Sequence, residues 1–149
     1  MKILVSDNLA ESGIQLLRDI PEFQVDVNTG LAPEDLCRII KDYDALVIRS
    51  ATKVTSKIIE AADNLKVIAR AGIGLDNVDI PAASKRGIVV MNTPEGNVIT
   101  TAEHAIAMLL ALSRNIPQST RSMKAGKWEK KRFQGHEVFN KVLGIIGIG

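Results

Sequence analysis

The feature that most constrains the fold is a regular alternation of short apolar runs with helix-length amphipathic segments. Runs rich in valine, isoleucine and leucine have the length of β-strands at residues 2–6, 23–27, 44–50, 65–70 and 87–92. The segments between them carry apolar residues at helical spacing. Near-continuous apolar strands joined by crossover helices are typical of a parallel sheet that is covered on both faces. Residues 1–96 are therefore predicted to form an α/β domain.

The pattern changes at "NTPEGN", residues 92–97, where proline and glycine interrupt it. The following segment, "TTAEHAIAMLLALSRN", is predicted to form a long, strongly apolar helix. A second helix is expected from Pro117 to near Gly126. The sequence closes on "KVLGIIGIG", which is predicted to be a strand leading into Gly-x-Gly. Residues 97–149 are thus predicted to open a second, incomplete domain.

Composition and charge argue against several classes of function. The net charge is only +2, and the basic residues are spread along the chain, so nucleic acid is not an expected partner. A single cysteine, Cys37, excludes an internal disulfide framework and fits a reducing compartment. No apolar run approaches the roughly 20 residues that span a bilayer. No metal site is expected, because no spacing of histidine, cysteine or carboxylate resembles one. We expect a cytoplasmic protein.

Candidate binding residues follow the predicted strands. Ligands of an open parallel sheet bind outside the carboxyl ends of its strands. The loops at residues 6–7, 49–50, 71–74 and 92–94 are therefore expected on one rim. Arg49 offers a planar guanidinium to a carboxylate or phosphate, and Asn92 can donate and accept. The glycines of "AGIG" allow backbone N–H groups to face a ligand. A surface ion pair for Arg49 and an ordinary tight turn for "AGIG" are the alternatives. The predicted site comprises Arg49, Ser50, Gly72, Ile73, Gly74 and Asn92.

The closing glycines indicate a second kind of site. Gly147 and Gly149 match the first two glycines of G-x-G-x-x-G, the dinucleotide-binding fingerprint. Its third glycine and the helix facing the phosphates would lie further along a chain. His104 falls in the long apolar helix and is expected to pack or to contact a partner. His136 has no evident carboxylate to orient it, so neither histidine is predicted to be catalytic.

Several segments together resemble the D-isomer-specific 2-hydroxyacid dehydrogenases. "AGIGLDNVD" and "NTPEGN" are similar to stretches that mark the family, and "RSATKVT" and "MKAGKWEKKRF" to its phosphoglycerate branch. The resemblance covers nearly the whole chain. It implies that residues 1–96 form most of a flavodoxin-like, lid-like substrate-binding domain. Residues 97–149 would begin a Rossmann NAD-binding domain, whose early helices form a homodimer or homotetramer interface.

The resemblance also implies roles for individual residues. Arg49 and Ser50 match contacts to the substrate anion, and the loop around Ile73 faces substrate and nicotinamide. Some relatives have a hydroxyl residue where Ile73 stands, so no side-chain hydrogen bond to the cofactor is expected there. Gly147 and Gly149 match the pyrophosphate loop. The catalytic Arg, Glu and His of the family occur downstream of Gly149, so none is expected here.

The implied reaction of the intact enzyme is NAD-dependent oxidation of 3-phosphoglycerate, a small anionic 2-hydroxy acid. Its product is 3-phosphohydroxypyruvate, in the first step of serine biosynthesis, and this segment alone is expected to be inactive. A glyoxylate or hydroxypyruvate reductase is the nearest alternative. A corepressor that senses NAD(H) and a freestanding flavodoxin-like binding or dimerising module are alternatives from other classes.

Overall fold

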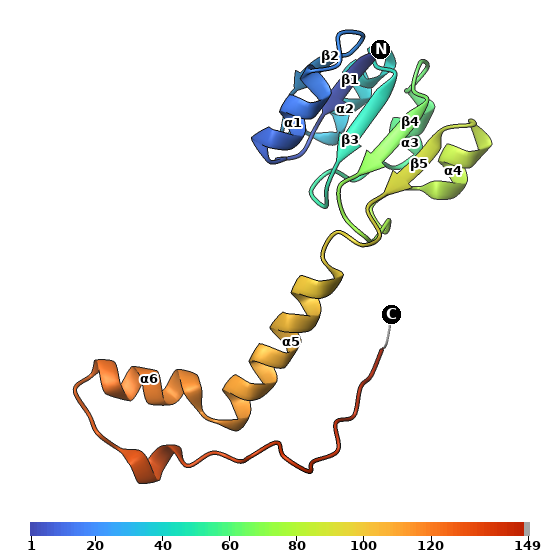
Figure 1. Cartoon of the computed structure of the whole chain (residues 1–149). Helices are drawn as coiled ribbons and strands as arrows, with labels where there is room; N and C mark the ends of the chain where they lie inside the picture. Colours follow the sequence, from blue (N-terminus) through green and yellow to red (C-terminus); the bar gives the residue numbers. More distant parts are fainter. Residues whose placement is uncertain (148–149) are drawn as a thin grey trace. The chain divides into compact units, whose positions relative to one another are not determined.

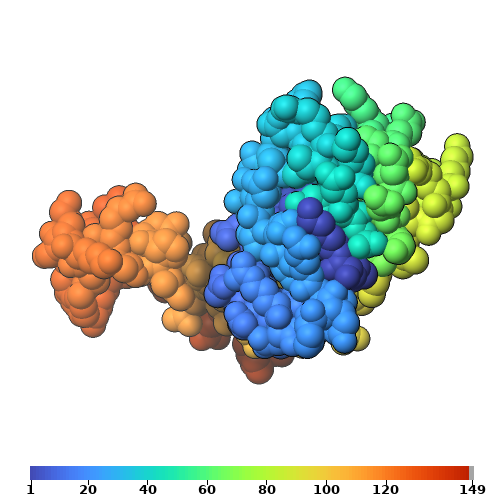
Figure 2. Space-filling model, turned by 90° about the horizontal axis from the view of Figure 1, so that it is seen from above, coloured from blue at the N-terminus to red at the C-terminus, as the bar shows by residue number. Residues whose placement is uncertain are grey.

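The computed structural model describes residues 1–147 and divides into two compact units, Met1–Asn97 and Val98–Gly149 (Figure 1). The first unit carries a five-stranded sheet, and the second carries two α-helices and an irregular segment. In the space-filling view the first unit, coloured from blue through green to yellow, is seen as one continuous mass (Figure 2).

All five strands of the first unit are parallel, in the order β2-β1-β3-β4-β5. They are β1 Lys2–Val5, β2 Gln24–Val27, β3 Ala45–Ile48, β4 Val67–Arg70 and β5 Val89–Asn92. Each lies within, or within one residue of, the apolar run that predicted it. The prediction of a parallel α/β fold is confirmed.

Three helices cover one face of this sheet. The helices of the first unit are α1 Glu11–Arg18, α2 Pro33–Ile39, α3 Ser56–Glu60 and α4 Ile80–Lys85, and α2 continues into the 3-10 helix η1, Ile40–Asp42. Leu36 of α2, Ile59 of α3 and Ala83 of α4 share one hydrophobic core with Leu46 and Ile68 of the sheet. The α1 connection runs in the opposite direction along the sheet, so a right-handed crossover places α1 on the other face.

That other face is open over the edge strand β5. Val89 and Met91 are each 54% exposed, whereas Val90, which alternates with them, packs against the core. The expectation that both faces are covered is therefore wrong at β5, as far as residues 1–147 are concerned. The reason is topological: α1 is the only connection that runs toward β2, so only α1 is available to this face.

The second unit consists of α5 Val98–Ser113, α6 Ile116–Lys124 and the short 3-10 helix η2 Lys130–Phe133. Asn115 joins the two α-helices in a left-handed conformation, with φ +53°. None of the residues 98–147 is buried. Along the described part of the chain, no helix combines the length and the apolar character that a membrane crossing needs.

The predicted last strand is not formed in residues 141–147, which are irregular. A strand needs a neighbour to satisfy its backbone N–H and C=O groups. Among its described residues the second unit contains no strand that could be this neighbour. The apolar pattern of residues 141–147 is consequently not sufficient to form a strand.

Candidate anion-binding site

The rim at the carboxyl ends of the strands brings the predicted residues of the first unit together. In the register of the sheet, Ile48 of β3 pairs with Arg70 of β4, and Arg70 pairs with Asn92 of β5. The loops that leave these positions therefore start side by side. They carry Arg49, Ser50, Gly72, Ile73 and Gly74, and Asn92 is the last residue of β5.

The loop of residues 49–52, which follows β3, is held by a carboxylate from the loop after β1. Asp7 accepts hydrogen bonds from the backbone N–H of Arg49 at 2.6 Å and of Thr52 at 3.1 Å. It also accepts the Thr52 hydroxyl at 2.7 Å. That hydroxyl lies 3.0 Å from the hydroxyl of Ser6. Asp7 is only 5% exposed, so these bonds take the place of water.

The charge state of Asp7 follows from the same contacts. Burial on its own raises the pKa of the Asp7 carboxyl, but the hydrogen bonds from Thr52 and from backbone N–H groups such as that of Arg49 outweigh it. The pKa is held below its ordinary value, because these donors favour the ionised form. Asp7 is therefore an anion at neutral pH whose charge is satisfied inside the rim.

The loop of residues 72–74 is held by side chains from the strand ends. Arg70 donates through Nη1 to the Gly74 carbonyl and through Nε to the Arg49 carbonyl at 3.4 Å. Asn92 donates through Nδ2 to the Ile73 carbonyl at 2.7 Å. The amide donor predicted to face a ligand is thus already bonded to this loop.

The two glycines of this loop lie close to the ends of flexible side chains, which can move, so close packing does not by itself require glycine at either position. A Cβ at Gly72 would stand 2.8 Å from Nη1 of Arg70, and one at Gly74 would stand 2.9 Å from a carboxylate oxygen of Asp76. Neither glycine has a positive φ. A tight turn that needs the left-handed region is therefore not the reason for "AGIG".

Two guanidinium groups give the rim its positive charge. Arg49 is exposed, and its Nη1 donates to the Asn8 carbonyl at 3.2 Å. Within residues 1–147, neither Arg49 nor Arg70 forms an ion pair with a carboxylate. The alternative of a surface ion pair for Arg49 is not supported. Guanidinium groups free of carboxylates are suited to bind carboxylate or phosphate.

Sequence reasoning missed three residues of this arrangement, namely Thr52, Arg70 and Asn77, and it placed Asp7 on this rim without giving it a role. Arg70 had a recognisable signal, because it is the only charged residue of the apolar run "VIAR" and directly precedes the glycine loop. Asn77 had none. Its Nδ2 donates to the carbonyls of Arg49 and Thr52, both at 2.7 Å, across more than twenty residues of sequence.

The predicted cofactor residues at the end of the chain are not brought into a site. Gly147 lies in an irregular segment with φ +83°, and a Cβ there would meet no atom within 4 Å. Gly149 lies outside the described residues. His104 is exposed on α5, and His136 is exposed in the segment after η2. Nowhere in residues 1–147 do three or more histidine, cysteine or carboxylate side chains gather as metal ligands would.

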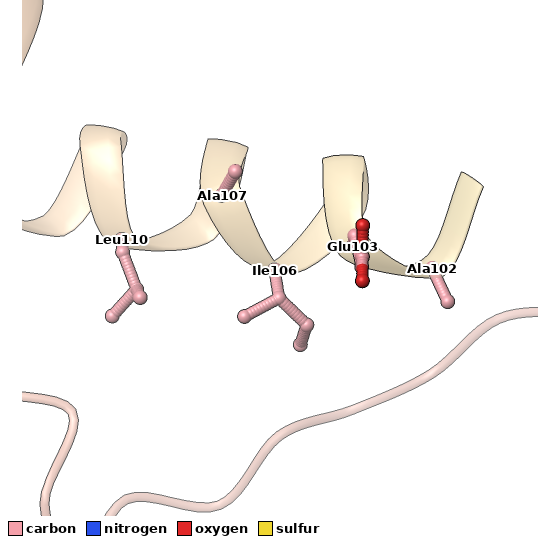
Figure 3. A pocket seen from close by; sticks show the side chains of 5 residues that line it. All are labelled: Ala102, Glu103, Ile106, Ala107 and Leu110. Carbon is pink, nitrogen blue, oxygen red and sulfur yellow. The ribbon is translucent and has the colours of Figure 1, made fainter. Parts of the chain in front are cut away.

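A shallow hollow beside α5 does not suit an anionic ligand. It is lined by Ala102, Glu103, Ile106, Ala107 and Leu110, all from this helix (Figure 3). Its one charged side chain is an acid, and its other lining residues are apolar. An anion would find no cation there.

Comparison with known proteins places these features in a family. Residues 3–145 match the family described as D-isomer specific 2-hydroxyacid dehydrogenase, catalytic domain. The chain is 53% identical to D-3-phosphoglycerate dehydrogenase of Synechocystis sp. over 148 residues. The aligned region covers 99% of this chain and 26% of that protein. It spans about a quarter of the length of such curated relatives.

Two solved structures resemble this chain in fold. One is an NAD⁺-bound 3-phosphoglycerate dehydrogenase of Entamoeba histolytica, with 38% identity and a TM-score of 0.68, covering 76% of this chain and 39% of that one. The other is an NAD-dependent formate dehydrogenase of Staphylococcus aureus in complex with NAD. It has 29% identity and a TM-score of 0.73, and covers 93% of this chain and 46% of that one. The chain therefore belongs to the D-isomer specific 2-hydroxyacid dehydrogenases.

Proposed function

We propose that this chain supplies the substrate-binding part of an NAD-dependent dehydrogenase that oxidises 3-phosphoglycerate to 3-phosphohydroxypyruvate. This reaction is the first step of serine biosynthesis. The observation that carries the proposal is the pair of guanidinium groups, Arg49 and Arg70, which lie on one rim and form no ion pair with a carboxylate within residues 1–147. A substrate with both a carboxylate and a phosphate needs cationic groups of this kind. The names of relatives at about half identity support the substrate.

Different residues of the rim would bind different groups of the substrate. Arg49 and Ser50 would take one anionic group of the substrate, and Arg70 would draw the second toward the glycine loop. Backbone N–H groups of residues 72–74 would line the same edge. We assign residues 1–96 to substrate binding and residues 97–149 to the start of the NAD-binding domain.

NAD, when bound, supplies the acceptor for the hydride that leaves the substrate. Ile73, Gly147 and Gly149 are the residues of this chain that we propose to contact it. Gly147 fits that role, because its positive φ and the open space at its Cα let a pyrophosphate approach the backbone. No acid–base residue of the reaction is assigned to this chain, which by itself is expected to be inactive.

The test is steady-state NAD reduction by the full-length protein. We expect turnover of 3-phosphoglycerate, and a KM for unphosphorylated glycerate or glycolate at least about tenfold higher, since losing one charge-assisted contact costs about 1.5–3 kcal/mol. Arg49→Gln is expected to raise the KM for 3-phosphoglycerate by a similar factor. Arg18→Gln is the matched control, because Arg18 is exposed on α1 and its guanidinium pairs with Glu11 of the same helix.

Two results would contradict the assignment. Equal use of phosphorylated and unphosphorylated acids would favour a glyoxylate or hydroxypyruvate reductase. Tight NADH binding with an assembly change and no turnover of any acid would favour an NAD(H)-sensing protein.

We also propose that the second unit forms a homo-oligomer contact, as a homodimer or homotetramer. The support is the exposed apolar surface of α5, where Ile106 is 51%, Met108 57% and Leu112 75% exposed. A cytoplasmic setting belongs to the same proposal and is supported by the free thiol of Cys37.

A further inference from the structure

The loop of residues 49–52 carries the anion-binding candidates but has no regular secondary structure of its own. Its conformation therefore depends on what its backbone groups bond to. Two buried side chains from elsewhere in the chain hold its backbone, and Nε of Arg70 adds a longer hydrogen bond of 3.4 Å to the Arg49 carbonyl. Asp7 comes from the loop after β1, and Asn77 comes from the connection between β4 and α4.

Asp7 and Asn77 engage the same two loop residues with opposite polarity. Asp7 accepts the N–H groups of Arg49 and Thr52, and Asn77 donates to the C=O groups of Arg49 and Thr52. Both backbone groups of Arg49 and both of Thr52 are thereby bonded to a buried side chain. This arrangement leaves the backbone at Arg49 little freedom to rotate, while its guanidinium stays exposed.

Asn77 is a buried polar residue with one polar atom that has no hydrogen-bond partner among the described residues. It is 9% exposed, and its Oδ1 is the one buried side-chain polar atom without a hydrogen-bond partner in residues 1–147. A buried acceptor without a partner lowers the stability of a fold. An apolar residue of similar size would avoid that cost but would not donate to the loop. Such a buried polar group that costs stability is expected where it serves a site.

We propose that Asp7 and Asn77 are positioning residues that hold the backbone of residues 49–52, and through it the Arg49 guanidinium, in the geometry that binds the anionic substrate. This inference rests on the function proposed above. Neither side chain is required to touch the substrate. Their effect is on the affinity for the anion, because a loop that is already ordered loses less conformational entropy when the ligand binds.

A similar aspartate at the opposite edge of the sheet offers a matched control. Asp44 directly precedes β3 and accepts the backbone N–H of Lys2 at 2.8 Å and the Lys66 ammonium at 2.8 Å. Like Asp7 it bridges neighbouring segments, but it contacts no residue of the rim. Replacing it tests the loss of a structural carboxylate without disturbing residues 49–52.

The experiment compares Asp7→Ala, Asn77→Ala and Asp44→Ala in the full-length protein. We expect the first two to raise the KM for 3-phosphoglycerate at least tenfold, with kcat changed less than threefold and the KM for NAD unchanged. Asp7→Asn should restore part of the affinity, because its amide oxygen can still accept the Arg49 N–H. Asp44→Ala should lower the melting temperature and leave the KM within twofold.

The proposal is overturned if both rim variants fold and keep a KM within twofold of the wild type, or if Asp44→Ala raises the KM as much as they do. If Asp7→Ala does not fold, Asp7→Asn and Asn77→Ala decide by the same criterion. If the wild type turns over no acid, the proposed function fails separately. Calorimetric titration with inorganic phosphate then decides: tenfold weaker binding by Asp7→Ala supports the positioning role, and equal or absent binding by both proteins refutes it.

Discussion

Individual buried polar residues of the first unit form hydrogen bonds at opposite edges of the sheet. Asp7 and Asn77 organise the carboxyl edge, where the anion site is proposed. Tyr43, which precedes β3, donates to Asp26 at 2.9 Å, and the Lys2 ammonium lies 4.5 Å from the centre of its ring. Tyr43 is 8% exposed. It has no part in the proposed site, so its contacts are expected to affect stability alone.

The pKa of Tyr43 leads to a prediction at this scale. Burial, the hydrogen bond to Asp26 and the nearby charges of Asp26 and Asp42 raise its pKa from 10.0 to about 12. The folded state therefore keeps the proton at a pH where the unfolded state has lost it. Its stabilising effect is complete below pH 10 and is lost as the pH rises toward 12.

We expect the free energy of unfolding to fall between these pH values by on the order of 2 kcal/mol. Urea denaturation across the range would measure the fall. Tyr43→Phe keeps the ring and removes the ionisation, so its stability should fall less steeply. An equally steep fall in the variant would assign the effect to another group.

Among the secondary-structure elements, β3 is the central strand of the sheet in the first unit. It pairs with β1 on one side and with β4 on the other. Leu46 at its middle is fully buried in the core shared with α2 and α3. We expect Leu46→Ala to lower the free energy of unfolding by about 2–5 kcal/mol, because it removes transfer energy and leaves a cavity.

Leu16→Ala on α1 is the control for this prediction, since Leu16 is 70% exposed. Its effect should stay within about 0.5 kcal/mol. Both variants can be measured by chemical denaturation. A loss below about 1 kcal/mol for Leu46→Ala would mean that the core closes around the cavity far more than such cores do.

At the scale of the whole molecule, the two units differ in whether they bury their apolar residues. The first buries a continuous core, whereas no residue between 98 and 147 is buried, although α5 is strongly apolar. Exposed apolar surface of this extent is typical of an interface. This difference is the basis of the proposed oligomer contact.

The corresponding prediction uses charge to disrupt that contact. The double variant Ile106→Glu, Leu110→Glu places two carboxylates on one face of α5, because the positions are four residues apart. We expect a shift of the full-length protein from oligomer to monomer in sedimentation velocity. Thr101→Glu, at an exposed position of the same helix, should leave the oligomer intact. A wild-type monomer, or an unchanged oligomer in the double variant, would refute the contact.

The sequence was sufficient to predict the strands and the rim because both depend on local patterns. An apolar run such as that of β3 is selected by burial whatever its partners are. Once the strands are parallel, Arg49 and Asn92 must follow them at the same edge. The closing segment had the same kind of pattern and forms no strand in residues 141–147, because a strand also requires a neighbour.

By itself, then, the amino-acid sequence determined the alternation of elements, the parallel sheet and the set of loops from which a site can be built. The tertiary structure alone decided that Asp7 and Asn77 hold residues 49–52, that Asn92 donates to the Ile73 carbonyl, and that β5 leaves one face exposed. The physical reason is the range of the interactions. The periodicity that predicts helices and strands depends on residues that are close in sequence. A hydrogen bond such as that between Asp7 and Arg49 joins residues 42 positions apart and forms only after the chain has folded.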